Sequence, residues 1–505
     1  MNTRSLFNRI LIANRGEIAV RVIRACREMG IESVAVYSDA DERALHASLA
    51  DHAVRIGPPP AAESYLSIDA ILSAARQSDA RAIHPGYGFL SENADFAAAC
   101  ENAGLTFIGP PAAAIEGMGS KIAARQTAIK AGVPVIPGET PTDQSDRAIA
   151  AAAGRVGFPV LLKPSEGGGG IGMKTARNAD DLVAAIAQAR REAVAAFGDG
   201  TLYVERLIER PRHVEFQVLA DRHAQVLHLF ERECSIQRRH QKVIEESPSP
   251  VVSAALRRRM GEAAIAVARA AGYLNAGTIE FLVEGAGDSA RFYFLEMNTR
   301  LQVEHPVTEQ VTGTDLVRAQ IAVAAGQPLP WRQEDLEQRG HAIELRVYAE
   351  DPARQDLPQA GTLLLYREPS MPGIRIDAGV TEGSEVAVHY DPLLAKLIAT
   401  GETRDVARHR ALAALRHYPI LGIRTNIPLL IALLEHPRFV AGEIDTGFLD
   451  AEGEVIRSGL PSIPPPEVLA VATVARAEGP SLAATRRGTV VNGVDPWSSL
   501  RGARV

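Results

Sequence analysis

Glu296-Met-Asn-Thr-Arg-Leu-Gln-Val-Glu-His-Pro306 is the stretch of this 505-residue sequence that decides the fold. Polar side chains stand at every second position of it, at Glu296, Asn298, Arg300, Gln302 and Glu304. Successive side chains of a β-strand point to opposite faces, so this spacing predicts a strand with one uniformly polar face. Few strands with a purely structural role have such a face, and the stretch marks a candidate functional site.

A second strand is predicted just before it, in Thr278-Ile-Glu-Phe-Leu-Val-Glu284, next to the strand Arg291-Phe-Tyr-Phe-Leu-Glu-Met-Asn298. Glu296 and Asn298 share one face of the later strand, and Glu280 can join them from its neighbour. Two carboxylates and an amide oxygen are hard ligands that suit Mg²⁺. The competing interpretation is ordinary ion pairing of strand carboxylates at a solvated face. The polar residues that follow at the same spacing favour the metal site.

The N-terminal segment predicts a βαβ unit. Arg9-Ile-Leu-Ile-Ala-Asn-Arg-Gly16 is a short buried strand ending in a turn, apolar residues at helical spacing follow, and Ser33-Val-Ala-Val-Tyr37 is a second strand. The first turn carries a single glycine, so the Gly-x-Gly-x-x-Gly fingerprint of dinucleotide binding is absent. The segment is Rossmann-like without indicating a nicotinamide cofactor.

Three further segments carry residues suited to binding. Lys163-Pro-Ser-Glu-Gly-Gly-Gly-Gly-Ile-Gly-Met173 runs from a strand into glycines that can cover phosphates, although such runs also form plain loops and this one lacks P-loop spacing. The segment Glu231-Arg-Glu-Cys-Ser-Ile-Gln-Arg-Arg-His-Gln-Lys242 concentrates basic side chains that can bind anions, and the alternative interpretation is a solvated charge run. Ile83-His-Pro-Gly-Tyr-Gly-Phe-Leu-Ser-Glu-Asn93 is as compatible with a structural role as with a functional one.

Composition limits the partners and the compartment. The net charge of -7 gives no general basic field for a nucleic acid. The widely spaced Cys26, Cys100 and Cys234 indicate neither a disulfide framework nor a zinc site. The first residues lack a signal peptide, and no apolar run is long enough to cross a bilayer. We expect a cytoplasmic protein with no nucleic-acid partner and no membrane partner.

Together these segments resemble the biotin carboxylase family of ATP-grasp enzymes. The resemblance runs in order from about Ile10 to Asp450, through Ile-Ala-Asn-Arg-Gly-Glu-Ile-Ala, the His-Pro-Gly-Tyr turn motif, Gln-Arg-Arg-His-Gln-Lys, the opening stretch and Arg-Val-Tyr-Ala-Glu-Asp-Pro. It implies an α/β and α+β fold. The expected parts are a Rossmann-like N-terminal domain at 1–120, a linker helix at 121–136, a mobile ATP-grasp lid at 137–207, the ATP-grasp body at 208–335, a biotin carboxylase C-terminal domain at 336–450, and a linker or the start of a truncated or absent carrier region at 451–505.

The resemblance also implies an ATP-dependent ligase. Its reaction is the carboxylation of biotin on a carrier by ATP and bicarbonate through carboxyphosphate, the first half-reaction of an acyl-CoA carboxylase. The Arg-Val-Tyr-Ala-Glu-Asp-Pro variant is similar to α-subunits of acetyl-, propionyl- and methylcrotonyl-CoA carboxylases. The implied partners are a biotin carboxyl carrier protein or domain, a carboxyltransferase subunit, and a second copy of the chain in a homodimer or larger complex. Two alternatives stay open: another ATP-grasp ligase, and a non-catalytic nucleotide-binding assembly subunit.

The same resemblance gives individual residues their roles. The residues matched to ATP contacts are Lys121, Lys163, Gly169, Gly170, Glu205, Arg206, Leu207, Ile208, His213, Gln237, His240 and Leu282. Those matched to Mg²⁺ or Mn²⁺ are Glu280, Glu296 and Asn298. Bicarbonate is matched to Lys242, Arg300, Gln302 and the Val303 backbone, its base to Glu304, and the stabilisation of the biotin anion to Arg346.

Two features depart from the family pattern. Glu166 begins the glycine run and Ile171 replaces a basic residue, so we expect nucleotide affinity or lid closure to differ. Asp495-Pro-Trp-Ser-Ser-Leu-Arg-Gly502 is similar to the start of the region that leads to the biotinyl domain in fused α-subunits. The only Met-Lys pair, Met173-Lys174, lies in the glycine loop and is no biotinylation motif. We therefore expect biotin to come on another chain, or the sequence to be truncated.

Overall fold

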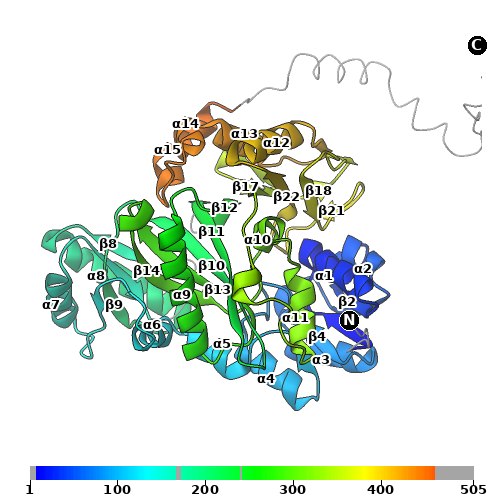
Figure 1. Ribbon diagram of the computed structural model, residues 1–505, viewed down its shortest axis with the longest axis horizontal. Helices are drawn as coiled ribbons and strands as arrows, with labels where there is room; N and C mark the ends of the chain where they lie inside the picture. Colours follow the sequence, from blue (N-terminus) through cyan, green and yellow to red (C-terminus); the bar gives the residue numbers. More distant parts are fainter. Residues whose placement is uncertain (1–6, 166–171, 239–240, 461–505) are drawn as a thin grey trace, which may run out of the picture. The chain divides into compact units, whose positions relative to one another are not determined.

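A five-stranded parallel sheet forms the N-terminal part of the fold in the computed structural model, which describes residues 7–165, 172–238 and 241–460 (Figure 1). Its strand order is β3-β2-β1-β4-β5. The strands are β1 (Arg9–Ile12), β2 (Glu32–Ser38), β3 (His52–Gly57), β4 (Ala82–His84) and β5 (Thr106–Phe107), and the helices are α1 (Gly16–Glu28), α2 (Leu45–Leu49), α3 (Ile68–Gln77), α4 (Ala94–Asn102) and α5 (Ala112–Gly119). The parallel pairing of β1 with β2 across α1 confirms the predicted βαβ unit.

The turns after β1 and β4 are tied together at the carboxyl end of this sheet. Asn14 Nδ2 donates to the carbonyl oxygens of Pro85 and Tyr87, both at 2.7 Å. Gly86 has a φ of +64°, and a Cβ at this position would lie 2.9 Å from Asn14 Nδ2, so glycine is required there. Ligands bind in open α/β sheets at the strand ends where the strand order reverses. Two of the quoted motifs meet at this place, between β1 and β4.

A small antiparallel sheet of order β6-β9-β7-β8 follows. Its strands are β6 (Gly138–Glu139), β7 (Val160–Pro164), β8 (Lys174–Ala176) and β9 (Leu202–Arg206), and its helices are α7 (Asp146–Val156) and α8 (Ala179–Phe197), preceded by α6 (Lys121–Lys130). Buried Ile149, Leu162, Ile186 and Val204 form its own core. All four strands lie inside the segment 137–207, whose mobility stays a prediction.

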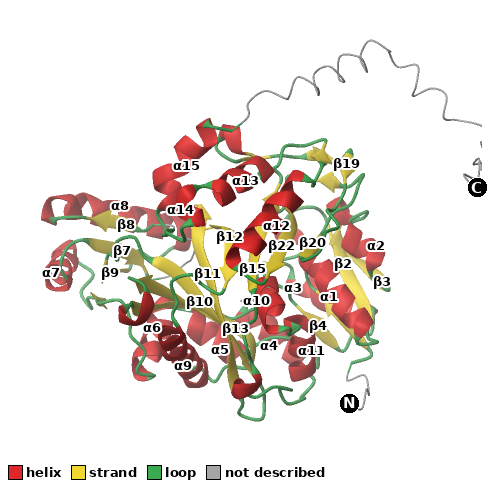
Figure 2. Ribbon diagram, turned by 45° about the horizontal axis from the view of Figure 1, so that its top comes forward, coloured by secondary structure: helices red, strands yellow, loops and turns green. Residues whose placement is uncertain are grey.

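The central element is an eight-stranded antiparallel sheet of order β14-β13-β10-β11-β12-β15-β22-β20 (Figure 2). Its strands are β10 (Arg212–Ala220), β11 (Val226–Arg238), β12 (Gln241–Ser247), β13 (Asn275–Glu284), β14 (Arg291–Asn298), β15 (His341–Tyr348), β20 (Ile374–Ala378) and β22 (Leu393–Gly401), and α9 (Ala254–Ala270), α10 (His305–Thr312) and α11 (Leu316–Ala324) accompany it. Strand β12 lies before residue 336 and β15 after it, and the two strands pair. One sheet therefore contains strands from both sides of the domain boundary that the sequence suggested at residue 336.

The remaining elements are short strands and helices near the C-terminus. They are β16 (Glu350–Asp351), β17 (Leu357–Pro358), β18 (Gly361–Thr362), β19 (Leu365–Tyr366), β21 (Glu385–Val386), β23 (Ile420–Leu421), α12 (Arg404–Arg416), α13 (Ile427–Glu435), α14 (Pro437–Val440) and α15 (Phe448–Ser458). Helix α15 continues into the segment expected to be a linker from residue 451. In the described part of the chain, no helix has the length and apolarity to cross a membrane.

The expectation of one polar strand from Glu296 to Glu304 is wrong. Strand β13 pairs with β14 as predicted, but the ladder ends at the pair Thr278–Asn298, and residues 299–304 form a loop. The chain must turn there, because α10 begins at His305 with Pro306 in its first turn. The period of two in this second half therefore does not come from strand geometry.

Candidate active site

A row of charged side chains crosses four strands of the large sheet. The register pairs Glu296 with Glu280, Glu280 with Glu215, and Glu215 with Arg232. Residues paired directly across neighbouring strands lie on the same face. Glu215 and Arg232 are fully buried, and Arg232 Nε donates to Glu215 Oε1 at 2.6 Å. Residues 231–236, the first half of the predicted basic segment, are thus a buried part of the sheet and not a solvated charge run.

Lys242, on β12, connects this row to helix α10. Its Nζ donates to Glu215, to Glu280 Oε1 at 3.0 Å and to Glu304 Oε1 at 2.5 Å. Burial lowers the pKa of a lysine, but these carboxylates outweigh burial and hold the pKa of Lys242 well above its usual range. One ammonium group is therefore shared by three buried carboxylates from three elements.

Glu304, the residue matched to the base, immediately precedes α10 and is fully buried. Its Oε2 accepts a hydrogen bond from Arg346 Nη2 at 3.0 Å, and its Oε1 accepts the bond from Lys242. Burial raises the pKa of a carboxyl, but the charges of Lys242 and Arg346 reverse the shift and hold the pKa of Glu304 well below its usual range. The group is therefore an ionised carboxylate that can accept a proton.

Arg300 organises the loop 299–303. Its Nε donates to Glu92 Oε2 at 2.8 Å, which ties the loop to the turn motif after β4. Its Nη2 donates to Asn298 Oδ1 at 2.9 Å and its Nη1 to Gln302 Oε1 at 2.7 Å. The guanidinium thereby joins the metal-matched and bicarbonate-matched residues.

The rest of the loop is also fixed by side chains from elsewhere in the chain. Gln302 Nε2 donates to Glu280 Oε1 at 3.2 Å. Lys396 Nζ donates to the carbonyl oxygen of Val303 at 2.7 Å. The structure thus brings together all four residues that the resemblance assigns to bicarbonate: Lys242, Arg300, Gln302 and Val303.

Glu280, Glu296 and Asn298 fit a divalent cation. The register places Glu296 opposite Glu280, with Asn298 two residues further along the same face. Burial and the neighbouring Glu280 charge raise the pKa of Glu296, so a cation beside Glu296 would stabilise its ionised form. Asn298 Oδ1 accepts one bond from Arg300 and retains a second lone pair. An oxygen-preferring cation would relieve the repulsion between the two carboxylates.

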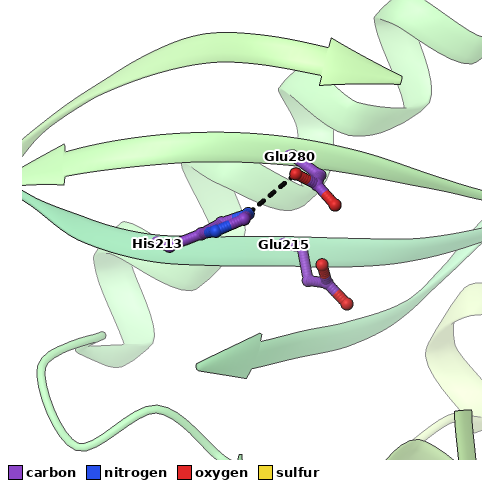
Figure 3. Close-up of side chains that lie close together, drawn as sticks. All are labelled: His213, Glu215 and Glu280. Carbon is purple, nitrogen blue, oxygen red and sulfur yellow. Dashed lines mark ion pairs between the residues drawn. The ribbon is translucent and has the colours of Figure 1, made fainter. Parts of the chain in front are cut away.

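A second cluster of possible metal ligands, His213, Glu215 and Glu280, lies on β10 and β13 (Figure 3). Its ligand atoms lie within 4.8 Å of one another. His213 Nε2 is already 2.8 Å from Glu280 Oε2, and Lys242 and Arg232 both contact Glu215. Protein cations thus neutralise this cluster, and an ion is better accommodated beside Glu296.

The described residues matched to ATP lie on the small antiparallel sheet, on the large sheet, on α6 and in the connection between the two sheets. Lys163 Nζ on β7 lies 2.6 Å from Glu205 Oε2 on β9, and both side chains are buried. Burial lowers the pKa of a lysine, but the Glu205 charge outweighs it and raises the pKa of Lys163. Lys163 is therefore a fixed cation at the start of the glycine run, which suits a phosphate.

The chain from Glu205 to Ile208 crosses between these sheets. Arg206 Nη2 donates to Tyr293 Oη at 2.9 Å, and the Leu207 amide donates to the Pro159 carbonyl at 2.9 Å. Ile208 packs in a small apolar cluster with Ile136, Tyr293 and Leu282.

The other ATP-matched residues are placed less uniformly. Lys121 is the first residue of α6, and its charge lowers the pKa of Glu296 against the burial that raises it. Gln237 stands opposite Lys242 in the β11–β12 hairpin. Gly169, Gly170 and His240 lie outside the described residues, as do Glu166 and Ile171.

A cavity of about 460 Å³ opens beside Arg300, Val303 and Arg346. Its aromatic lining residues come from the turn after β4 (Tyr87 and Phe89), from the end of β15 (Tyr348) and from the segment before β22 (His389 and Tyr390), and Arg15, Glu17 and Asp391 add charged groups. The aromatic rings beside the buried guanidinium of Arg346 suit a flat, uncharged heterocycle that becomes anionic during a reaction.

Sequence reasoning missed several residues of this network. Glu215 follows His213 by two positions, an alternation that could have revealed it. Glu92 stands in a quoted motif without an assigned role. Lys396 and Glu245 carry no local signal, since their partners Val303 and Arg346 lie 93 and 101 residues away in the sequence.

Three family models match successive parts of the chain. They describe a biotin carboxylase N-terminal domain (residues 6–115), the ATP-binding domain of the carbamoyl-phosphate synthase L chain (120–332) and a biotin carboxylase C-terminal domain (344–451). Fold, site and matches together define an ATP-grasp enzyme, as the sequence indicated.

Individual proteins narrow this class. The biotin carboxylase of Halalkalibacterium halodurans is 52% identical over 444 residues, 88% of this chain and 97% of that protein. The mitochondrial methylcrotonoyl-CoA carboxylase subunit alpha of Oryza sativa subsp. japonica is 52% identical over 443 residues, 88% of this chain but 60% of the relative. The biotin carboxylase domain dimer of Hydrogenobacter thermophilus 2-oxoglutarate carboxylase, solved with MgADP, ADP and bicarbonate, is 44% identical with a TM-score of 0.84, covering 89% of this chain and 98% of that one. The chain belongs to the biotin carboxylase family, and the predicted ligase class is confirmed.

Proposed function

We propose that this chain carboxylates biotin with ATP and bicarbonate through carboxyphosphate. The observation that carries the proposal is Glu304, a buried carboxylate kept ionised between Lys242 and Arg346. It stands between a loop suited to an anion and a cavity suited to a heterocycle. A base in this position can act on bicarbonate while the neighbouring cations hold the negative charge that develops.

Bicarbonate would bind among Lys242, Arg300 and Gln302. An anion there would share the cations that now pair with Glu304, so the pKa of Glu304 would rise towards the range of an effective base. Glu304 would take the proton of bicarbonate, whose oxygen would form a bond to the terminal phosphorus of ATP. The bond from that phosphorus to ADP would break, leaving ADP and carboxyphosphate.

ATP would lie between the lid sheet and the large sheet. Lys163 and Lys121 would contact its phosphates, and the chain from Glu205 to Ile208 would contact its base. A divalent cation at Glu280, Glu296 and Asn298 would neutralise phosphate charge. Gly169, Gly170 and His240 are proposed contacts from the resemblance alone.

Biotin would enter the cavity beside Arg346. Carboxyphosphate would break into CO₂ and phosphate, the phosphate would accept the proton of the ureido nitrogen of biotin, and that nitrogen would form a bond to the CO₂. Arg346 would stabilise the anion, a role for which arginine is suited because it stays charged at every relevant pH. Arg346 Nε is fixed at 2.6 Å from Glu245 Oε1, so the guanidinium is already oriented.

We further propose the partners of this reaction. Biotin would arrive on a carrier protein or domain, and carboxybiotin would pass to a carboxyltransferase subunit that selects the acyl-CoA. The chain spans 60% of the methylcrotonoyl-CoA carboxylase relative, whose name supports an acyl-CoA as final acceptor. A homodimer and a cytoplasmic location complete the proposal.

Steady-state ADP release tests this function. We expect ATP hydrolysis that requires bicarbonate and Mg²⁺ and that free biotin stimulates. Folded protein that binds ATP without either dependence would contradict the proposal. Faster turnover with ammonia or an amino acid than with biotin would point to another ATP-grasp ligase.

A further inference from the structure

Lys396 is a fully buried lysine outside the set matched to ATP, metal, bicarbonate and biotin. It lies on β22, directly opposite Arg346 on β15. Its Nζ donates to the Val303 carbonyl at 2.7 Å and lies 3.1 Å from Glu17 Oε1. Burying an ammonium group is unfavourable unless it is well paired, so packing alone does not explain a lysine at this position. A role at Val303 would account for it.

The contact fixes one of the two peptide groups that flank Val303. Peptide groups are planar, so holding the Val303 carbonyl also orients the Glu304 N–H in the same plane. The preceding peptide group, which contains the Val303 N–H, is held by His305, whose Nδ1 lies 2.8 Å from the Gln302 carbonyl oxygen. Two buried side chains thus hold the two peptide groups on either side of Val303, and Lys396 is the charged one.

Lys396 also connects this loop to the large cavity. Its counter-ion Glu17 accepts a hydrogen bond from the Tyr87 hydroxyl, and both Glu17 and Tyr87 line that cavity. The N-terminal sheet, the loop and β22 therefore share one buried network.

We propose that Lys396 is a positioning residue for bicarbonate: it anchors the Val303 carbonyl, while His305 holds the preceding peptide group, so that the Val303 N–H, Gln302 and Glu304 converge on one anion. The inference rests on the proposed function, because that function places bicarbonate at this loop. It assigns Lys396 no contact with substrate. Its loss should weaken bicarbonate binding more than ATP binding.

Lys396→Met tests the anchor, since methionine fills similar space without a donor. A hydrogen bond from a charged donor contributes about 1.5–3 kcal/mol, so we expect the KM for bicarbonate to rise about 10-fold or more. The KM for ATP should stay within about twofold, because no ATP-matched residue contacts Lys396 among the described residues. Equal rises of both constants would overturn the positioning role.

Two further variants separate positioning from stability. Lys396→Met removes the ion-pair partner of the buried Glu17. The double variant Lys396→Met/Glu17→Gln removes both charges of this pair. It should recover only part of the lost melting temperature, because the charges of Glu344 and Asp377 also interact with Lys396, and it should keep the raised KM for bicarbonate. Arg257→Met breaks a different, partly buried ion pair, with Glu231 at 2.6 Å, and should lower the melting temperature without changing that KM. If both Lys396 variants fail to fold while Arg257→Met folds, Lys396 is structural and the inference is wrong.

A measurement without turnover distinguishes this inference from the proposed function. Bicarbonate that binds the folded state raises the melting temperature. Wild type should show this shift in the presence of MgADP, and the folded double variant should lose most of it. A shift in wild type without any turnover would sink the proposed function alone. The positioning role would be overturned if bicarbonate raised the melting temperature of the double variant as much as that of wild type, or if it raised neither.

Discussion

Glu296–Asn298 and Arg300–Glu304 are halves of one sequence motif, but different forces hold them. The first half belongs to β14, where backbone pairing with β13 sets the position of every side chain. The second half is a loop, and its side chains are placed by Glu92, Lys242 and Arg346. A ladder tolerates the loss of one side chain, whereas a loop held by side chains does not. Substituting the residues that support the loop should therefore change the KM for bicarbonate more than it changes the dependence on Mg²⁺.

The largest effect is expected for Glu304→Gln, in the loop half. The amide cannot accept the bicarbonate proton, and general-base catalysis contributes about 10²–10⁴-fold to a rate. We expect kcat to fall by about that factor, while ATP affinity measured by calorimetry stays largely intact. Unchanged turnover in the folded variant would refute the role of Glu304 as base.

The regular half of the motif was predictable from its sequence, and the irregular half was not. Alternation and apolar content identified β13, β14 and the first βαβ unit, because strand periodicity is a local property. The same alternation continues to Glu304 in the sequence and predicts a longer strand, but the strand ends at Asn298. Nothing between Thr299 and Glu304 is a strong breaker, and the chain turns because α10 begins at His305.

Long-range contacts explain most of what the sequence could not provide. Lys242 was matched to bicarbonate through the resemblance, but its three-way contact with Glu215, Glu280 and Glu304 depends on strands brought together by the fold. The continuation of the large sheet through residue 336 depends likewise on β12 pairing with β15. Domain lengths and individual site roles stay predictions, whereas the family and the fold class are confirmed.

Glu296→Gln probes the strand half and should give the next largest effect. Losing one carboxylate ligand weakens the binding of a divalent cation, and the loss of even an outer-shell partner of a metal ligand costs about 10–100-fold in affinity or activity. We expect the Mg²⁺ concentration for half-maximal turnover to rise about that much, with the KM for bicarbonate little changed. Titrating Mg²⁺ at fixed bicarbonate, and bicarbonate at saturating Mg²⁺, measures both. A change confined to bicarbonate would contradict the division of the motif.

Glu92→Gln probes the support of the loop half from another part of the chain. Glu92 accepts hydrogen bonds from Arg300 Nε at 2.8 Å and from the Thr299 amide at 3.0 Å. Its side chain is 41% exposed, so solvent weakens the charge interaction, and we expect the KM for bicarbonate to rise only about twofold to fivefold. Glu101→Gln, at an exposed position on α4, is the matched control and should have wild-type kinetics. If Glu92→Gln changed the Mg²⁺ concentration needed for half-maximal turnover instead of the KM for bicarbonate, the two halves of the motif would not act independently.

The smallest expected effect concerns Glu245, a strand-held residue that supports the loop half through Arg346. Burial raises the pKa of Glu245 to about 7, despite the opposing charge of Arg346. The folded state therefore retains a proton that the unfolded state has released above about pH 4.5, and stability falls as pH rises towards 7. Glu245→Gln cannot ionise and lacks this loss. Its free energy of unfolding relative to wild type should improve by about 1 kcal/mol between pH 5.5 and 6.5, as measured by urea unfolding. A difference that is constant over this range would mean that Glu245 is already ionised in the folded protein, and that Arg346 compensates both Glu245 and Glu304.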